Sequence, residues 1–73
     1  MAVNTAELRR RAEVLDRAVD RVIAQDRERR ALRYANAPAD TRDHASSLYD
    51  TEVGNLMEEA HRMTKFVKEA SSE

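Results

Sequence analysis

Apolar residues recur at helical spacing in two long stretches of the chain, and one short breaker segment separates them. The first stretch covers about residues 5–35, and its apolar residues follow one another mostly at steps of three and four, which places them on one stripe of a helix. This stripe consists of Leu8, Ala12, Leu15, Val19, Val22 and Ile23. The breaker covers residues 36–40 and contains Pro38, which lacks an N–H group and restricts the residue before it.

The second stretch covers about residues 41–70, and its apolar positions span about half of the helix circumference at ~100° per residue. These positions are Ala45, Leu48, Tyr49, Val53, Leu56, Met57, Ala60, Met63, Phe66, Val67 and Ala70. One neighbouring helix cannot cover so wide a stripe, so the pattern predicts further helices from a second copy. The predicted fold is an all-α, antiparallel two-helix hairpin over residues 1–73, with a turn at 36–40 and a frayed tail at 71–73, dimerising into a four-helix bundle with coiled-coil contacts.

Side chains at the expected helix ends support this division. Asn4, followed three residues later by Glu7, is typical of a capping box at the start of the first helix. Asn36 is suited to the left-handed residue that ends a helix, and Asp40 or Thr41 can cap the second helix. We assign the core and dimer contacts to Leu15, Val19, Val22, Leu48, Val53, Leu56, Met57, Met63, Phe66 and Val67.

Length and charge narrow the classes of function. A hairpin of 73 residues without cysteine has one layer in which to bury its stripes and no disulfide to support it, which also favours self-association. The net charge is −1, and 37% of residues are charged, so polyanion binding is not its expected main task. Residues 4–35 carry nine Arg and six acidic residues, whereas residues 36–73 carry four basic and eight acidic residues, so the two helices have opposite net charge.

The turn end of the hairpin has the residues that are hardest to explain by the stability of the fold alone. It gathers four arginines and a tyrosine: Arg27, Arg29, Arg30, Arg33 and Tyr34. One interpretation is a recognition surface for an acidic protein or for phosphates. The other is a solvated helix end, where cations favour the helix dipole and pair with nearby acids. We predict that these five residues form the partner-binding site.

Signatures of catalysis or of a bound cofactor do not emerge from the sequence. Glu58 and His61 have the Glu-x-x-His spacing of di-iron bundles, but their helical phase points both away from the stripe. The serines and histidines are not accompanied by a glycine-rich turn that could form an oxyanion hole. We therefore expect no enzyme activity, no metal and no cofactor. The absence of a long apolar run predicts a cytoplasmic protein without a membrane span.

A short run in the second helix, Asp43-His44-Ala45-Ser46-Ser47-Leu48-Tyr49, resembles the plasmid RNA-binding hairpin Rop at five of seven positions. The match does not extend to the first helix, where Rop carries its RNA-binding residues. The resemblance implies a dimeric four-helix bundle and, as an alternative function, RNA or DNA binding. From the residues themselves we expect a small protein-binding, regulatory or adaptor protein of bacterial or phage type, or a subunit of a larger helical assembly, with itself and an unidentified protein as partners.

Overall fold

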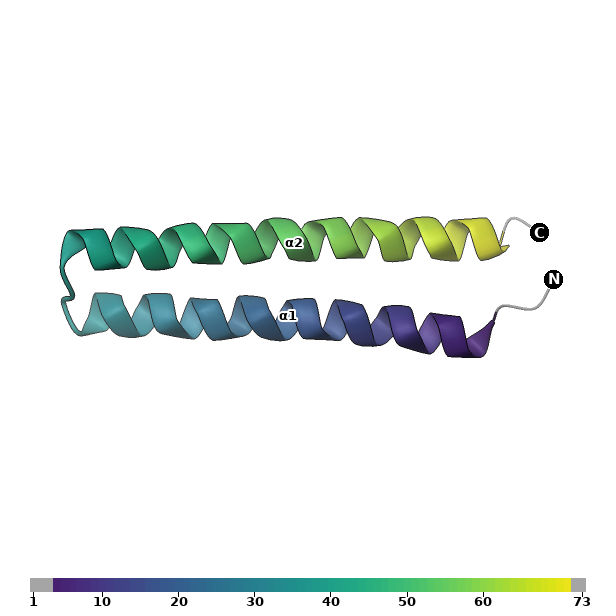
Figure 1. The fold of residues 1–73 in the computed structure, drawn as a ribbon, viewed down its shortest axis with the longest axis horizontal. Coiled ribbons are helices and arrows are strands. Elements are labelled where there is room, and N and C mark those ends of the chain that lie inside the picture. Colours follow the sequence, from purple (N-terminus) through teal and green to yellow (C-terminus); the bar gives the residue numbers. More distant parts are fainter. Residues whose placement is uncertain (1–3, 72–73) are drawn as a thin grey trace.

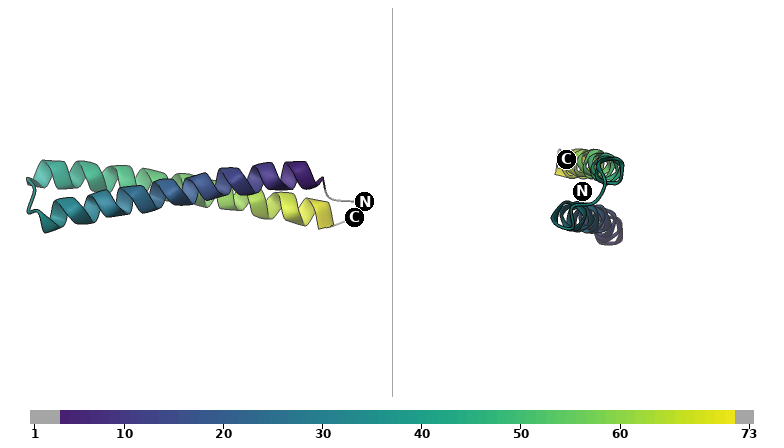
Figure 2. Two further views of the ribbon diagram at one scale, coloured as in Figure 1. Left: turned by 90° about the horizontal axis from the view of Figure 1, so that it is seen from below. Right: turned by 90° about the vertical axis from the view of Figure 1, so that its left-hand side faces the viewer.

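The protein is an antiparallel hairpin of two long α-helices, α1 (Thr5–Tyr34) and α2 (Ala39–Ser71), which confirms the predicted all-α hairpin (Figure 1). The computed structural model describes residues 4–71. The molecule is a rod with extents of 55 × 16 × 11 Å, and its two helices cross at a shallow angle along their length (Figure 2). No helix among the described residues is both long and apolar enough to cross a membrane.

A regular seam joins the two helices. Its residues recur at alternating steps of three and four, which is the heptad spacing of a coiled coil. On α1 the seam consists of Leu8, Arg11, Leu15, Ala18, Val22, Gln25, Arg29 and Leu32, all buried or half-buried. On α2 it consists of Ala45, Tyr49, Glu52, Leu56, Glu59, Met63, Phe66 and Ala70, again all buried or half-buried.

The seam differs from the stripe that the apolar residues of the first stretch predict. That stripe includes Val19 and Ile23, which are exposed on α1. It also stops before residue 25, whereas the seam continues through Gln25 and Arg29 to Leu32. The long apolar stem of an arginine can line a helix contact while its charged end stays near water. A count of apolar residues alone therefore misplaces the stripe.

Two arginine–aromatic contacts join the helices. The guanidinium carbon of Arg11 lies 4.5 Å from the centre of the Phe66 ring, and that of Arg29 lies 4.3 Å from the centre of the Tyr49 ring. Between them, Arg21 Nε and Glu52 Oε2 form an ion pair across the helices at 2.9 Å.

Capping residues explain where α1 begins and ends. The Asn4 side chain accepts a hydrogen bond from the Glu7 backbone N–H at 3.1 Å, which confirms Asn4 as the N-cap. The Glu7 carboxylate, however, accepts from Arg10 and Arg11, and the reciprocal bond of a capping box is not formed among the described residues. Asn36 has φ 55°, the left-handed conformation predicted for it.

The start of α2 is earlier than predicted. The helix begins at Ala39, directly after Pro38, whose carbonyl oxygen accepts the Arg42 backbone N–H at 3.0 Å. Proline already has a φ compatible with helix entry and needs no N–H partner, so no side-chain cap is required before this point. Ser71, which was expected to be frayed, is the last residue of α2; residues 72–73 of the predicted tail lie outside the described residues.

Candidate functional site

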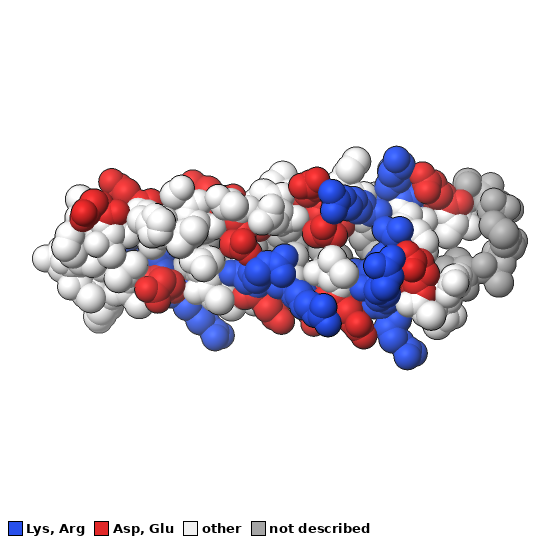
Figure 3. Space-filling model, in the orientation of Figure 1, with Lys and Arg blue, Asp and Glu red and all other residues white. Residues whose placement is uncertain are grey.

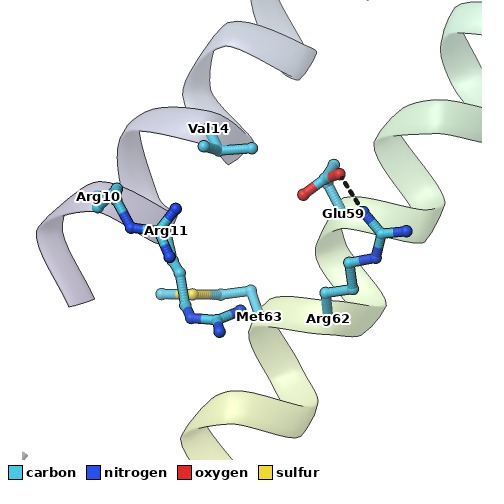
Figure 4. A pocket seen from close by; sticks show the side chains of 6 residues that line it. All are labelled: Arg10, Arg11, Val14, Glu59, Arg62 and Met63. Carbon is cyan, nitrogen blue, oxygen red and sulfur yellow. Dashed lines mark hydrogen bonds and ion pairs between the residues drawn. The ribbon is translucent and has the colours of Figure 1, made fainter. Parts of the chain in front are cut away.

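The seam divides the surface into two flanks of different chemistry. On one side lies a hollow of about 240 Å³ between the helices, lined by Arg10, Arg11, Val14, Glu59, Arg62 and Met63 (Figure 4). Steps of seven residues place Arg21 in the same row as Val14, and Leu48 and Asn55 in the same row as Arg62. We call this side the charged flank, and Figure 3 shows basic and acidic side chains crossing from one helix to the other on the face that it draws.

Local acids neutralise the arginines around this hollow. Arg10 Nη2 and Arg11 Nε lie 2.7 Å and 2.9 Å from the Glu7 carboxylate. Arg62 contacts both Glu58 and Glu59 at 2.8 Å, and Figure 4 shows it turned toward Glu59. The hydrogen bond from Arg10, more than any other contact, lowers the pKa of Glu7. The arginines around this hollow are therefore paired with acids of their own helix, whereas Arg21, further along the charged flank, pairs with Glu52 of the other helix.

The opposite side of the seam is apolar over its middle and its open end, and we call it the apolar flank. Toward the turn end, its rows on α1 continue with Asp26, Arg30 and Arg33. It contains a hollow of about 120 Å³ near the open end, lined by Leu8, Phe66, Val67, Ala70 and Ser71. The heptad positions place seven apolar residues on this flank: Ala12, Val19, Ile23, Val53, Met57, Ala60 and Val67. Several of them are large and exposed, with 43% of Ile23, 68% of Met57 and 46% of Val67 accessible to solvent.

At the turn end, the structure uses two of the five predicted partner-binding residues internally. Arg29 Nη2 lies 2.7 Å from Asp26 Oδ1, and Arg30 Nε lies 3.1 Å from Asp26 Oδ2. The hydrogen bond from Arg29 is the main cause of the lowered pKa of Asp26. Arg29 also stacks on Tyr49 within the seam, and its Nε is buried without a hydrogen-bond partner among the described residues.

The remaining three predicted residues face solvent. Arg27 and Arg33 are exposed and have no ion-pair partner among the described residues, and Tyr34 is 96% accessible. The structure therefore separates an ion-paired cluster of Asp26, Arg29 and Arg30, in which Arg30 is exposed, from an unpaired set of Arg27, Arg33 and Tyr34. Asp26 lies three residues before Arg29 and four before Arg30, and the interpretation of a solvated helix end expected this pairing with a nearby acid.

The residues assigned to core and dimer contacts also divide into two groups. Six of them are half-buried: Leu15, Val22, Val53, Leu56, Met63 and Phe66. The other four, Val19, Leu48, Met57 and Val67, are exposed. Leu48 alone among these four lies on the charged flank.

The Glu-x-x-His pair is on the surface, because both Glu58 and His61 are exposed. Within residues 4–71, no three His, Cys, Asp or Glu side chains are grouped so that they could hold a metal ion.

Comparison with known proteins adds no relative: the chain matches no family model, no curated protein and no solved structure.

Proposed function

We propose that this chain is a non-enzymatic protein-interaction module that associates through its helices into a homodimeric four-helix bundle and presents its turn end to a protein partner. One observation carries the proposal. Among the described residues, the buried apolar residues are two alanines, Ala18 and Ala45, while larger apolar side chains such as Ile23 and Met57 are exposed to solvent.

Such a core is too small to stabilise the hairpin by itself. Burial stabilises in proportion to the apolar area removed from water, and alanine contributes little area. Polar residues occupy five of the sixteen seam positions: Arg11, Gln25, Arg29, Glu52 and Glu59. Domains of this size often need a metal, disulfides or oligomerisation for stability. The chain has no cysteine, so a second helical pair is the simplest source of further burial.

The turn end supplies the surface for another protein. Tyr34 projects from the last turn of α1 with nearly all of its side chain in water, and Arg33 and Arg27 lie close to it along the same helix. Tyrosine and arginine are enriched among the residues that dominate protein–protein binding energies. Because both arginines lack an internal acid, an acidic partner can pair with them without breaking an existing contact.

The turn-end surface is tested by fluorescence anisotropy with a labelled Asp/Glu-rich peptide at physiological salt. We expect the double variant Arg27→Ala, Arg33→Ala to keep the helicity of the wild type and to bind the peptide about tenfold more weakly, since charge-assisted contacts are lost. The double variant Arg9→Ala, Arg17→Ala is the matched control, because it removes the same charge from exposed positions elsewhere on α1.

Equal affinity of the two double variants, or no peptide binding by the wild type, contradicts the turn-end assignment. A labelled RNA hairpin is measured in parallel. RNA binding that weakens steeply with added salt would favour the nucleic-acid alternative instead.

A further inference from the structure

We infer that the apolar flank is the dimer interface, and that a second copy of this chain covers it with its turn at the opposite end of the bundle. This inference rests on the proposed self-association and adds the face and the orientation. The flank is formed by both helices, and its apolar rows contain Ala12, Val19 and Ile23 on α1 and Val53, Met57, Ala60 and Val67 on α2.

The size of the flank matches that of a stable interface. The face that contains both helices side by side measures 55 × 16 Å between Cα positions. Stable complexes bury about 800 Å² on each partner, and a face of these dimensions is large enough to supply it. The exposed parts of Ile23 and Met57 would lie near the centre of such an interface, and that of Val67 would lie nearer the open end.

The charged flank is a poorer interface. A second copy there would remove from water the ion pairs of Arg10 with Glu7 and of Arg62 with Glu58, and desolvation of such pairs offsets their attraction. It would also leave Met57 and Val67 exposed. Burial of the apolar flank removes no ion pair from water at the centre of the flank.

The position of the apolar rows suits a two-fold axis. Val19 lies near the middle of α1 (Thr5–Tyr34), and Met57 lies near the middle of α2 (Ala39–Ser71). A two-fold axis at this level brings the apolar rows of two copies into contact. The two rods then overlap along their full length. A symmetric dimer requires such a self-complementary patch.

Charge selects the orientation. Arg27 and Arg33, which have no ion-pair partner among the described residues, both lie near the turn end of α1. With both turns at one end, the arginines of two copies would lie close together, and like charges repel. With the turns at opposite ends, the length of the rod separates the two arginine groups. Arg27 and Tyr34, which lie outside the rows of the apolar flank, then remain free for a partner.

The interface is tested with two lysine substitutions at exposed apolar residues of α2. Met57→Lys places a charge at the centre of the apolar flank, whereas Leu48→Lys is the matched control on the charged flank, with 42% of the Leu48 side chain exposed. We expect Met57→Lys to weaken dimerisation roughly a hundredfold, because an unpaired charge is buried in each copy. Leu48→Lys should leave the dimer unchanged in light scattering and sedimentation.

The orientation is tested with a nitroxide label attached to a single cysteine, introduced as Ala39→Cys at the turn end of a chain that has no other cysteine. We expect the two labels of the dimer to be separated by about the 55 Å length of the rod. A separation below half of this length would show the turns at the same end and overturn the proposed orientation.

The outcomes of the mass measurements separate the two proposals. A wild-type monomer would overturn the self-association and, with it, the interface. A wild-type dimer that survives Met57→Lys, or that Leu48→Lys also dissociates, would overturn the apolar flank as the interface and leave self-association intact. Met57→Leu is the conservative variant, and it should remain dimeric.

Discussion

Arg11 and Arg29 lie at seam positions that coiled coils usually fill with apolar side chains. Each places its guanidinium group over an aromatic ring of the other helix, Phe66 in one case and Tyr49 in the other. A cation over an aromatic face is attracted by the ring quadrupole, and the arginine stem packs against its neighbours. These two contacts link α1 and α2 near opposite ends of the rod.

Asp26 makes the hairpin sensitive to acid. Its pKa is lowered by the Arg29 hydrogen bond and by the charge of Arg30. A carboxylate with a depressed pKa stabilises the fold above its unfolded pKa of about 3.9, and this stabilisation is lost as the pH falls through the folded pKa. The unfolding temperature of the wild type should therefore stay nearly constant from pH 7 to about pH 5 and fall below about pH 4.

The Asp26→Asn variant tests this prediction by thermal unfolding followed by circular dichroism. It should be less stable than the wild type at pH 7 and should lose less stability between pH 5 and pH 3. Asp20→Asn is the control, since Asp20 is exposed and has no ion-pair partner among the described residues. Parallel pH profiles of the wild type and Asp26→Asn would show that the Asp26 contacts do not stabilise the folded state.

At the scale of single residues, the predicted α1 stripe differs from the observed seam because the seam contains polar residues. A pattern built only on apolar residues includes Ala12 and Val19 in the predicted stripe. It leaves out Arg11 and Arg29, which lie between the helices. Spacing alone would not have corrected it, since arginines at heptad positions are usually on the surface. The contacts with Phe66 and Tyr49 depend on the register of the two helices, which is a tertiary property.

The helices themselves follow closely from local signals, with differences of one or two residues at their ends. Asn4, Asn36 and Pro38 mark the boundaries because each has a backbone or side-chain property that a helix interior does not favour. The entry to α2 was placed late because a side-chain cap was expected where Pro38 was sufficient. The half-circumference stripe of α2 is now divided between the seam and the apolar flank.

Gly54 is the weakest position within α2. It is exposed on the outer face, it lacks a positive φ, and a Cβ atom added there would meet nothing within 4 Å. Alanine is favoured over glycine in a helix by about 1 kcal/mol. We expect Gly54→Ala to raise the unfolding temperature by about 4–8 °C, as measured by calorimetry.

Ala24→Gly is the matched opposite change, at an exposed position of α1. It should lower the unfolding temperature by a similar amount. A decrease in stability for Gly54→Ala would show that another chain approaches the backbone at Gly54, and this would contradict the placement of the dimer interface on the apolar flank.

At the scale of the whole molecule, the hairpin is a thin rod with one charged and one apolar side. The wide α2 stripe predicted that further helices are needed, but it could not show which face they cover. The difference between the flanks emerges only when the seam is known, because Val53, Ala60 and Val67 then fall on one side and Leu48, Asn55 and Arg62 on the other. Four of the exposed large apolar residues, Val19, Ile23, Met57 and Val67, lie on the apolar flank, whereas Leu48 lies on the charged flank and Tyr34 at the turn end.

The most direct test of this account is the solution mass of the wild-type chain by light scattering across a range of concentrations at physiological salt, with helicity recorded on the same samples. The account predicts twice the chain mass of 8.4 kDa at high concentration, with mass and helicity falling together on dilution because folding is coupled to association. A fully helical monomer of 8.4 kDa at every concentration would contradict it.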